Sequence, residues 1–172
     1  RSSGRSLSDW SDAWLRTSGL DTVLPELHVD DGRITDLTIV RDSVDARTGQ
    51  PANRPHTLAV GLYNLDDDVL TRSELVEVDI TSPRTPVKAV TGHRVPDLVL
   101  INDEDFSYAK VRLDEGGTDV ALDHLSDLDE PLTRALLWSV LWNAVRDAKL
   151  SVDSYLKACL LYTSPSPRDK RQ

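Results

Sequence analysis

The stretch PDLVLINDEDFSYAKVRLDE, residues 96–115, sets the pattern that decides the fold of this chain. An apolar run, Leu98–Ile101, is followed by a polar corner, Asn102–Asp105, and then by an aromatic-flanked segment, Tyr108–Leu113. Short apolar runs bounded by Asn and Asp are typical of strands joined by turns. Three consecutive acids beside an Asn could also form a metal or catalytic cluster, so the corner has two competing interpretations.

The same strand pattern extends toward the N-terminus. Apolar residues on both sides of Asp30–Gly32 predict a hairpin, because Asp-Gly between two such runs favours a tight turn. Further strands are expected at residues 58–63, 69–80 and 87–90, with a turn at 64–68. About seven short strands with no helix between them favour a small antiparallel β-sandwich over a parallel sheet.

Helical patterns flank the predicted strands. In LSDWSDAWLR, residues 7–16, apolar residues including Trp10 and Trp14 recur at the spacing of one helix face. Pro131, which follows two acidic residues, predicts the start of a second helix, and residues 152–158 form a third. The expected fold class is therefore mostly β with helical flanks: one helix, a small antiparallel β-sandwich, and then two or more helices.

Composition narrows the classes of partner and compartment. The 172 residues include 29 acids and 20 Lys or Arg, which gives a net charge of -9. This balance disfavours nucleic acid as a partner, and no apolar run reaches the roughly 18–20 residues needed to span a membrane. Cys159 is the only cysteine, which excludes an internal disulfide and a multi-thiolate zinc site. Without a recognisable signal peptide, we expect a cytoplasmic location.

The candidate functional residues do not combine into a recognisable motif. No two histidines have the spacing of helical metal ligands, and we expect surface positions at strand ends for His28, His56, His93 and His124. The acid clusters Asp66–Asp68 and Asn102–Asp105 lack the ligand order of a calcium loop and are interpreted as turns. Gly116–Gly117 lacks the Lys and Ser/Thr of a phosphate loop, and Cys159 has no nearby His. No catalytic, cofactor-binding or metal-binding residue is therefore assigned.

Three segments carry a resemblance to a known family. LSDWSDAWLRTSGLDTVLPEL resembles the junction between catalytic domain and sandwich in aminopeptidase N-like zinc metallopeptidases, particularly the actinobacterial type. PDLVLINDEDFSYAKVRLDE resembles the end of the sandwich in that family, and EPLTRALLWSVLWNAVRDAKLSVDSYL resembles the opening helices of its C-terminal helical domain. The three segments stand in the family's order, and together the resemblance covers about residues 6–158.

The resemblance implies a parent enzyme that removes N-terminal amino acids from peptides, using one zinc ion held by HExxH and a downstream Glu. Neither HExxH nor the family's Gly-Ala-Met-Glu-Asn type segment occurs in this chain, so no family catalytic residue is carried over. The resemblance therefore implies that this chain is an inactive, non-catalytic fragment that binds no zinc itself, with the sandwich as an interdomain spacer. Its partners would be the catalytic and C-terminal helical domains of the same protein, and peptide substrates only through the missing catalytic domain.

These inferences divide the chain into four expected segments. Residues 1–22 form the helical end of a catalytic domain, 23–117 the β-sandwich and 118–158 the first helices of a C-terminal helical domain. Residues 159–172 are expected to be a non-native, disordered tail, because YTSPSPRD resembles translated sequencing-adaptor read-through; a genuine Pro/Ser linker or kinase-substrate tail is the alternative. The alternative function is a stand-alone β-sandwich module that binds a ligand or protein.

Overall fold

A computed structural model of the protein describes residues 7–163. The elements in chain order are α1 (Ser8–Leu15), β1 (Thr22–Asp30), β2 (Arg33–Asp42), β3 (His56–Asp66), β4 (Val69–Ile80), β5 (Arg84–Pro86), η1 (Lys88–Val90), β6 (Leu98–Ile101), β7 (Lys110–Val111), α2 (Glu115–His124), η2 (Leu125–Asp127), α3 (Pro131–Arg146) and α4 (Val152–Thr163). The predicted fold class, mostly β with helical flanks, is confirmed.

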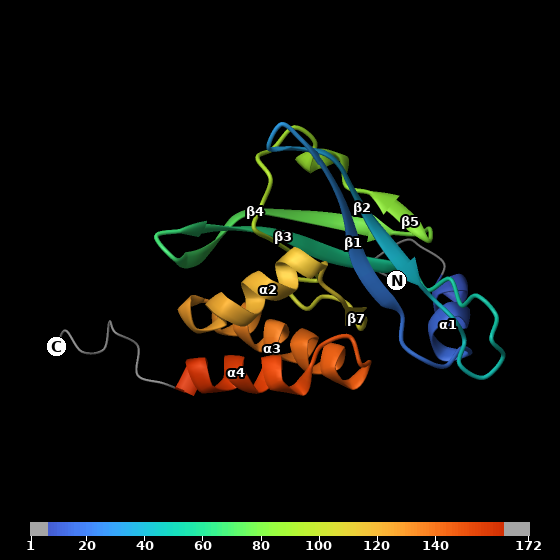
Figure 1. Cartoon of the computed structure of the whole chain (residues 1–172). Helices are drawn as coiled ribbons and strands as arrows, with labels where there is room; N and C mark the ends of the chain where they lie inside the picture. Colours follow the sequence, from blue (N-terminus) through green and yellow to red (C-terminus); the bar gives the residue numbers. More distant parts are fainter. Residues whose placement is uncertain (1–6, 164–172) are drawn as a thin grey trace.

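The strands form two sheets that share one hydrophobic core (Figure 1). One sheet has the order β5-β2-β1-β7 and the other has the order β4-β3-β6. All pairs between these strands are antiparallel except β1 with β7, which meet in parallel at Thr22↔Lys110 and Val23↔Val111. Because β7 follows the 102–109 loop, this pairing fixes the end of that loop beside the start of β1.

The two predicted hairpin turns are confirmed. Asp31 and Gly32 have φ values of 46° and 68°, and Asp67 and Asp68 have values of 48° and 64°. Both turns therefore place two consecutive residues in the left-handed region, as a type I′ hairpin requires. Gly and Asp tolerate this conformation better than most residues, which is why the local sequence was sufficient to predict it.

Burial separates the central strand from the edge strand of the smaller sheet. In β3, residues 58–63 are all buried, because β3 lies between β4 and β6. In β4 the partly or fully buried residues Val76, Val78 and Ile80 alternate with exposed ones. The continuous apolar run therefore marks the central strand, and the period of two marks the edge strand.

Two predicted strands differ from the structure. Residues 87–90 were expected to form a strand, but Lys88–Val90 is a 3-10 turn and the strand β5 lies just before it, at Arg84–Pro86. Val87 and Val90 are buried, so this run is apolar because it packs into the core and not because it pairs. Of the strand predicted over residues 108–113, only Lys110–Val111 pairs with a neighbour.

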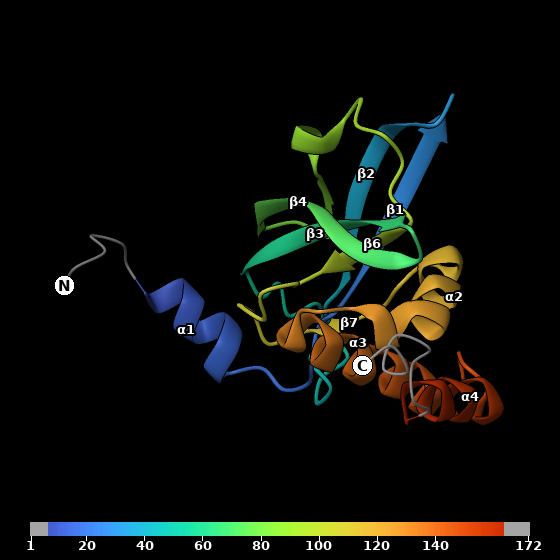
Figure 2. The ribbon, with the colours of Figure 1, turned by 90° about the vertical axis from the view of Figure 1, so that its left-hand side faces the viewer.

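The helices lie at two ends of the molecule (Figures 1 and 2). The helix α1 is at one end of the molecule. The helices α2, α3 and α4 lie together below the β3–β4 hairpin in Figure 1. The predicted helix starts at Pro131 and Val152 are confirmed, and α4 continues past Ala158 to Thr163. None of the helices within residues 7–163 combines the length and apolar character that crossing a membrane requires.

The helix α2 corrects the expectation that Gly116–Gly117 only separates two blocks. Both glycines lie inside α2, and the Asp114 carboxylate accepts a hydrogen bond of 2.6 Å from the Gly117 amide, which caps the helix. A Cβ on Gly117 would lie 3.1 Å from Leu98 Cδ1, so glycine permits close packing of α2 on β6. The helical block therefore begins at Glu115. Residues 1–6 and the tail from residue 164 onward lie outside the described residues.

Candidate functional site

The polar corner at residues 102–105 is buried at its start. Asn102 is 2% exposed and Asp103 is 0% exposed, whereas Asp105 is exposed. Asn102 and Asp105 have φ values of 63° and 54°, so the chain reverses here with Asp103 directed into the protein. The corner is a turn, as predicted, but its first acid is part of the interior.

Asp103 is the centre of a buried network that joins three elements. The Tyr63 hydroxyl on β3 donates to both carboxylate oxygens of Asp103, at 2.8 and 2.7 Å, and the Thr133 hydroxyl on α3 donates to Oδ1 at 3.1 Å. Arg72 on β4 donates to Asp103 at 3.1 Å and to Glu104 at 2.6 Å. This Asp103 network attaches the first turn of α3 to the smaller sheet.

The electrostatics of this network favour one hydrogen-bonding state. Burial raises the pKa of the Tyr63 hydroxyl, and the neighbouring Asp103 carboxylate raises it further. The hydroxyl therefore keeps its proton and remains a donor. Hydrogen bonds to Asp103 and Glu104 raise the pKa of Arg72, which keeps the guanidinium charged.

Gly61 makes the space that Asp103 occupies. A Cβ built on Gly61 would lie 2.2 Å from Asp103 Oδ2 and 2.8 Å from Tyr63 Cε2. Neither atom could remain in place, because the carboxylate and the ring are both buried. A glycine in the middle of a buried strand otherwise weakens it, so its presence in β3 is explained by this close approach.

A second buried network lies where α1 leads into β1. Asp21 is hydrogen bonded to the Arg54 guanidinium and, at 2.9 Å, to His56 Nε2. Arg54 also donates to the Thr17 hydroxyl at 2.9 Å and to the Ser18 carbonyl at 2.8 Å. The side chains of Asp21, Arg54 and His56 are at most 1% exposed. This Asp21 network attaches the segment after α1 to the start of β3.

The partners of Asp21 determine which nitrogen of His56 carries a proton. Burial alone would raise the pKa of Asp21, but hydrogen bonds from His56 and Arg54 outweigh it and hold this pKa below its usual value. An ionised carboxylate only accepts hydrogen bonds, so His56 Nε2 carries a hydrogen and donates it. In the neutral ring, Nδ1 is then an acceptor, and the Ser107 hydroxyl lies 2.6 Å from it.

Asn102 connects the two networks. Its side-chain nitrogen donates to the Ser107 carbonyl at 2.7 Å, and its side-chain oxygen accepts from the Ser107 amide at 3.0 Å. This pair of bonds fixes the 102–107 loop while Asp103, the next residue, enters the other network. The corner at residues 102–107 therefore links both the segment after α1 and the helix α3 to the smaller sheet.

Ser107 and His56 line a cavity of about 610 Å³ between α1 and the sheets. Aromatic side chains form much of its wall, namely those of Trp10, Trp14, Phe106 and Tyr108. The Trp14 indole donates to the Pro55 carbonyl at 3.2 Å, and its ring packs edge-on against His56 with centroids 5.1 Å apart. The polar array thus lies at a cavity whose wall combines these aromatic side chains with polar ones, among them Thr57, Asp79 and Thr81, a mixture that small-molecule sites also show.

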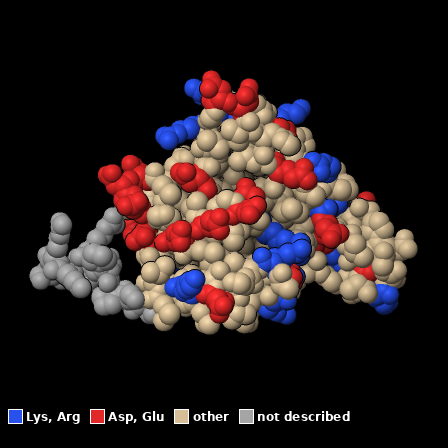
Figure 3. Space-filling view, in the orientation of Figure 1, with Lys and Arg blue, Asp and Glu red and all other residues tan. Residues whose placement is uncertain are grey.

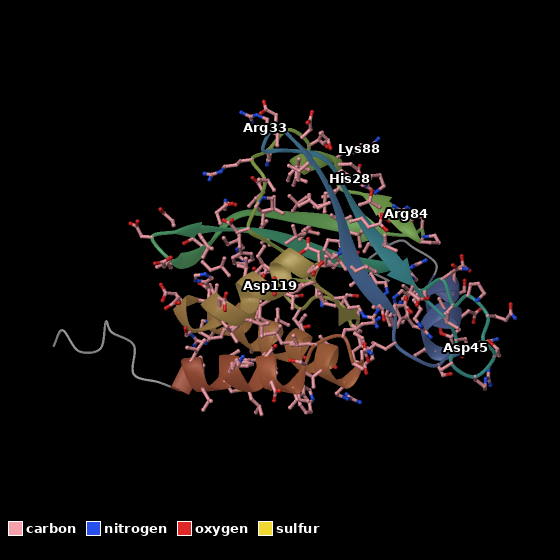
Figure 4. All side chains as sticks on the ribbon, in the orientation of Figure 1. His28, Arg33, Asp45, Arg84, Lys88 and Asp119 are labelled. Carbon is pink, nitrogen blue, oxygen red and sulfur yellow. The ribbon has the colours of Figure 1, made fainter. Side chains whose placement is uncertain are left out.

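The other candidate residues of the sequence lie apart from the hydrogen-bonded group formed by Asp21, His56 and Ser107. His56 is buried, contrary to the expected surface position, whereas His28 and His93 are exposed and His124 is half-buried. Figure 4 places His28 on the sheet, far from α1 and from the loop beside α1 that contains Asp45. Asp66–Asp68 is an exposed hairpin turn, and Cys159 lies half-buried on α4.

No local sequence pattern indicates that His56 is buried. Its partners Asp21 and Ser107 are 35 and 51 residues away along the chain, so no spacing rule connects them. Across residues 7–163 no three or more His, Cys, Asp or Glu side chains form a group that could hold a metal ion. The residues described therefore do not fit a zinc site.

Comparison with known protein families identifies the class of domain that part of the chain resembles. A family profile described as "ERAP1-like C-terminal domain" matches residues 98–167, which contain β6, β7 and the helices α2 to α4. The match includes the corner at residues 102–105 and Thr133, the partner of Asp103 on α3.

The particular relative is a curated protein named aminopeptidase N, from Streptomyces lividans. The chain is 42% identical to it over 163 residues, which is 92% of this chain and 19% of that protein. The resemblance to the aminopeptidase N-like family that three sequence segments predicted is confirmed. The chain spans less than a fifth of the length of this relative.

Proposed function

We propose that this chain is a non-catalytic segment of a zinc-dependent aminopeptidase that removes N-terminal amino acids from peptides. The observation that carries the proposal is the 42% identity to aminopeptidase N over 92% of the chain, which covers only 19% of the relative. In this proposal the sandwich is a spacer between the catalytic domain and the C-terminal helical domain. Peptide substrates bind through the catalytic domain, and the protein is cytoplasmic.

Exposed apolar side chains at both ends support the spacer role. On the segment around α1, Leu7 is 62%, Trp10 48% and Leu15 72% exposed. On α3 and the part of α4 before residue 159, the large apolar side chains at least half exposed are Trp142, Val152 and Leu156. Exposed apolar side chains gathered on one element are typical of a face that packs on another body, and α1 and α4 lie at separate ends of the molecule (Figure 2).

The two buried networks support the same role from the interior. The Asp21 network fixes the chain after α1 to β3, and the Asp103 network fixes α3 to β3 and β4. A spacer holds its neighbours at a defined separation only if both ends are rigidly attached. In Figure 3 the acidic side chains gather at the left edge and in a band across the middle of the face, a surface that disfavours phosphate backbones as partners.

In this proposal zinc is the cofactor of the parent enzyme. Within residues 7–163 no three or more His, Cys, Asp or Glu side chains form a group that could hold a metal ion, and we assign no zinc ligand there. This assignment predicts that the isolated chain has no aminopeptidase activity whether or not zinc is added.

The direct test uses the full 172-residue chain. Hydrolysis of aminoacyl 4-nitroanilides is measured with and without added zinc, beside Streptomyces lividans aminopeptidase N. We expect no release of 4-nitroaniline above the buffer rate. Robust zinc-dependent turnover by the chain alone would show that it is not a spacer.

A second test places the chain in the proposed context. The matched segment of the Streptomyces lividans protein is replaced by this chain, and a parallel chimera carries Trp142→Asp at the half-exposed position on α3. We expect the first chimera to keep aminopeptidase activity and the second to lose stability, because a charge would be buried at the domain contact. Equal melting temperatures for the two would contradict packing at this face.

The alternative is a stand-alone β-sandwich module that recognises a ligand or protein. The aromatic cavity between α1 and the sheets is the observation that favours it. The DNA sequence upstream of Arg1 would distinguish the two proposals. An open reading frame that encodes HExxH supports the peptidase. A start codon or signal peptide immediately upstream supports the module.

A further inference from the structure

Three residues from distant parts of the chain form a continuous hydrogen-bonded row. The Ser107 hydroxyl lies 2.6 Å from His56 Nδ1, and His56 Nε2 lies 2.9 Å from Asp21 Oδ2. A hydroxyl, an imidazole and a buried carboxylate in this order are the parts of an activated serine nucleophile. The two ring nitrogens are exchanged relative to the familiar serine hydrolases, but one still accepts and the other is held as a donor.

The imidazole is held in a fixed orientation by the groups around it. The ionised Asp21 keeps a hydrogen on Nε2, which leaves Nδ1 free to accept the hydroxyl proton. Trp14 packs against the ring of His56, and the side chain of His56 is 0% exposed. Arg54 holds the other oxygen of Asp21, so the carboxylate cannot turn away.

The serine is also presented to a cavity by a fixed loop. Asn102 bonds both the amide and the carbonyl of Ser107, so the hydroxyl is positioned by the backbone. The cavity of about 610 Å³ is large enough for a small organic molecule, and its wall includes Trp10, Phe106 and Tyr108. Apolar acyl groups fit such a wall better than charged ones.

We propose that Ser107 is a nucleophilic serine that accepts an acyl group from small apolar or aromatic esters, with His56 as its base and Asp21 as a positioning residue. The proposal concerns the chain on its own, in which Trp10 and the rest of the cavity wall are open. This activity is separate from the aminopeptidase activity of the proposed parent and needs no metal.

The chemistry balances with ester and water alone. Ser107 Oγ forms a bond to the ester carbonyl carbon while its proton passes to His56 Nδ1. The bond from that carbon to the alkoxy oxygen then breaks, and the proton on Nδ1 leaves with the alcohol. Water repeats the same steps on the acyl-serine, giving a carboxylic acid and restoring Ser107. No oxidant or reductant is involved.

The test uses the full chain, 4-nitrophenyl butyrate and EDTA. Release of 4-nitrophenolate and intact mass are followed together, and peptide mapping locates the butyryl group. We expect one butyryl group per chain on Ser107, formed in a burst before slow turnover. Ser107→Ala is expected to abolish the burst, whereas Ser82→Ala, which changes an exposed serine outside the cavity, leaves it unchanged.

A second variant separates chemistry from structure. His56→Gln can still donate to Asp21 but has no basic nitrogen, so the acylation rate is expected to fall about 10²–10⁴-fold while circular dichroism shows a retained fold. Asp21→Asn is expected to shift the pH profile of acylation, which a purely structural residue would not do.

Three results would overturn the proposal: no adduct on Ser107, equal labelling of Ser107 and Ser82, or an unchanged rate in folded His56→Gln. If His56→Gln does not fold, the adduct site and Ser107→Ala decide. Because EDTA is present throughout, failure here leaves the aminopeptidase assignment untouched, and failure of the zinc test leaves this one untouched.

Discussion

Removal of the Asp103 carboxylate tests whether the corner at residues 102–105 is a structural centre. In Asp103→Ala, the Tyr63 and Thr133 hydroxyls lose their shared acceptor in a buried position. An unsatisfied buried polar group costs about 1–3 kcal/mol. The two hydroxyls lie 3.2 Å apart and can still bond each other, and Arg72 keeps Glu104. We therefore expect a loss of about 3 kcal/mol rather than the sum of three broken bonds.

The measurement is urea unfolding followed by tryptophan fluorescence and circular dichroism. A loss of about 3 kcal/mol corresponds to a melting temperature lower by roughly 6–12 °C in a chain of this size. Trp138 and Trp142 lie on α3, so the tryptophan signal, to which Trp10 and Trp14 also contribute, includes the packing of α3. The two probes are expected to shift together if the network is part of one cooperative unit.

The matched control is Glu104→Ala. Glu104 is the next acid along the chain and also pairs with Arg72, but both side chains of this pair are about 30% exposed. A partly exposed ion pair contributes about 0–1 kcal/mol, so this variant is expected to stay close to the unsubstituted chain. A cycle with Tyr63→Phe is expected to give a coupling of about 1–3 kcal/mol with Asp103→Ala. Equal losses for Asp103→Ala and Glu104→Ala would refute the reasoning.

Further predictions concern packing and pH. Gly61→Ala is expected to cost about 1–3 kcal/mol by displacing Asp103, whereas Gly116→Ala, with open space around it in α2, is expected to be neutral or stabilising in the same urea titration. The pKa values of Asp21, Asp45 and Asp147 are below normal in the folded protein, so the unfolding free energy is expected to be full above about pH 5 and to fall as pH drops through the unfolded value of about 3.9. A urea midpoint unchanged between pH 7 and pH 3.5 would contradict this. Trp142→Ser is expected to lower the unfolding free energy by about 0.5–1.5 kcal/mol in the same titration, because the half-exposed ring packs on Tyr155 with centroids 5.6 Å apart.

Much of the fold follows from short-range rules that the sequence displays directly. The turns at Asp31–Gly32 and Asp67–Asp68 need residues that tolerate positive φ, and such residues stand there. The start of α3 at Pro131 follows from a fixed φ and a missing amide hydrogen, which suit a first helical turn. These features depend on neighbours within a few residues, so they can be predicted without knowing the tertiary structure.

The helix α2 shows where such rules fail. Gly116 and Gly117 have low helix propensity, and the pair was therefore interpreted as a break. In the structure the Asp114 cap and the close contact of Gly117 with Leu98 outweigh that propensity. Leu98 is much farther from Gly117 along the sequence than the three or four residues that separate neighbours on a helix face. No local pattern therefore contains this contact.

The sequence by itself determined that residues 102–105 form a turn after a buried strand, because Asn and Asp favour that backbone wherever they stand. Only the tertiary structure decided that Asp103 is buried and bonded, since its partners Tyr63 and Thr133 are 40 and 30 residues away. The same holds for the row formed by Ser107, His56 and Asp21, which three separate segments bring together. Backbone preference is local, whereas the burial of a charge depends on partners that only folding places beside it.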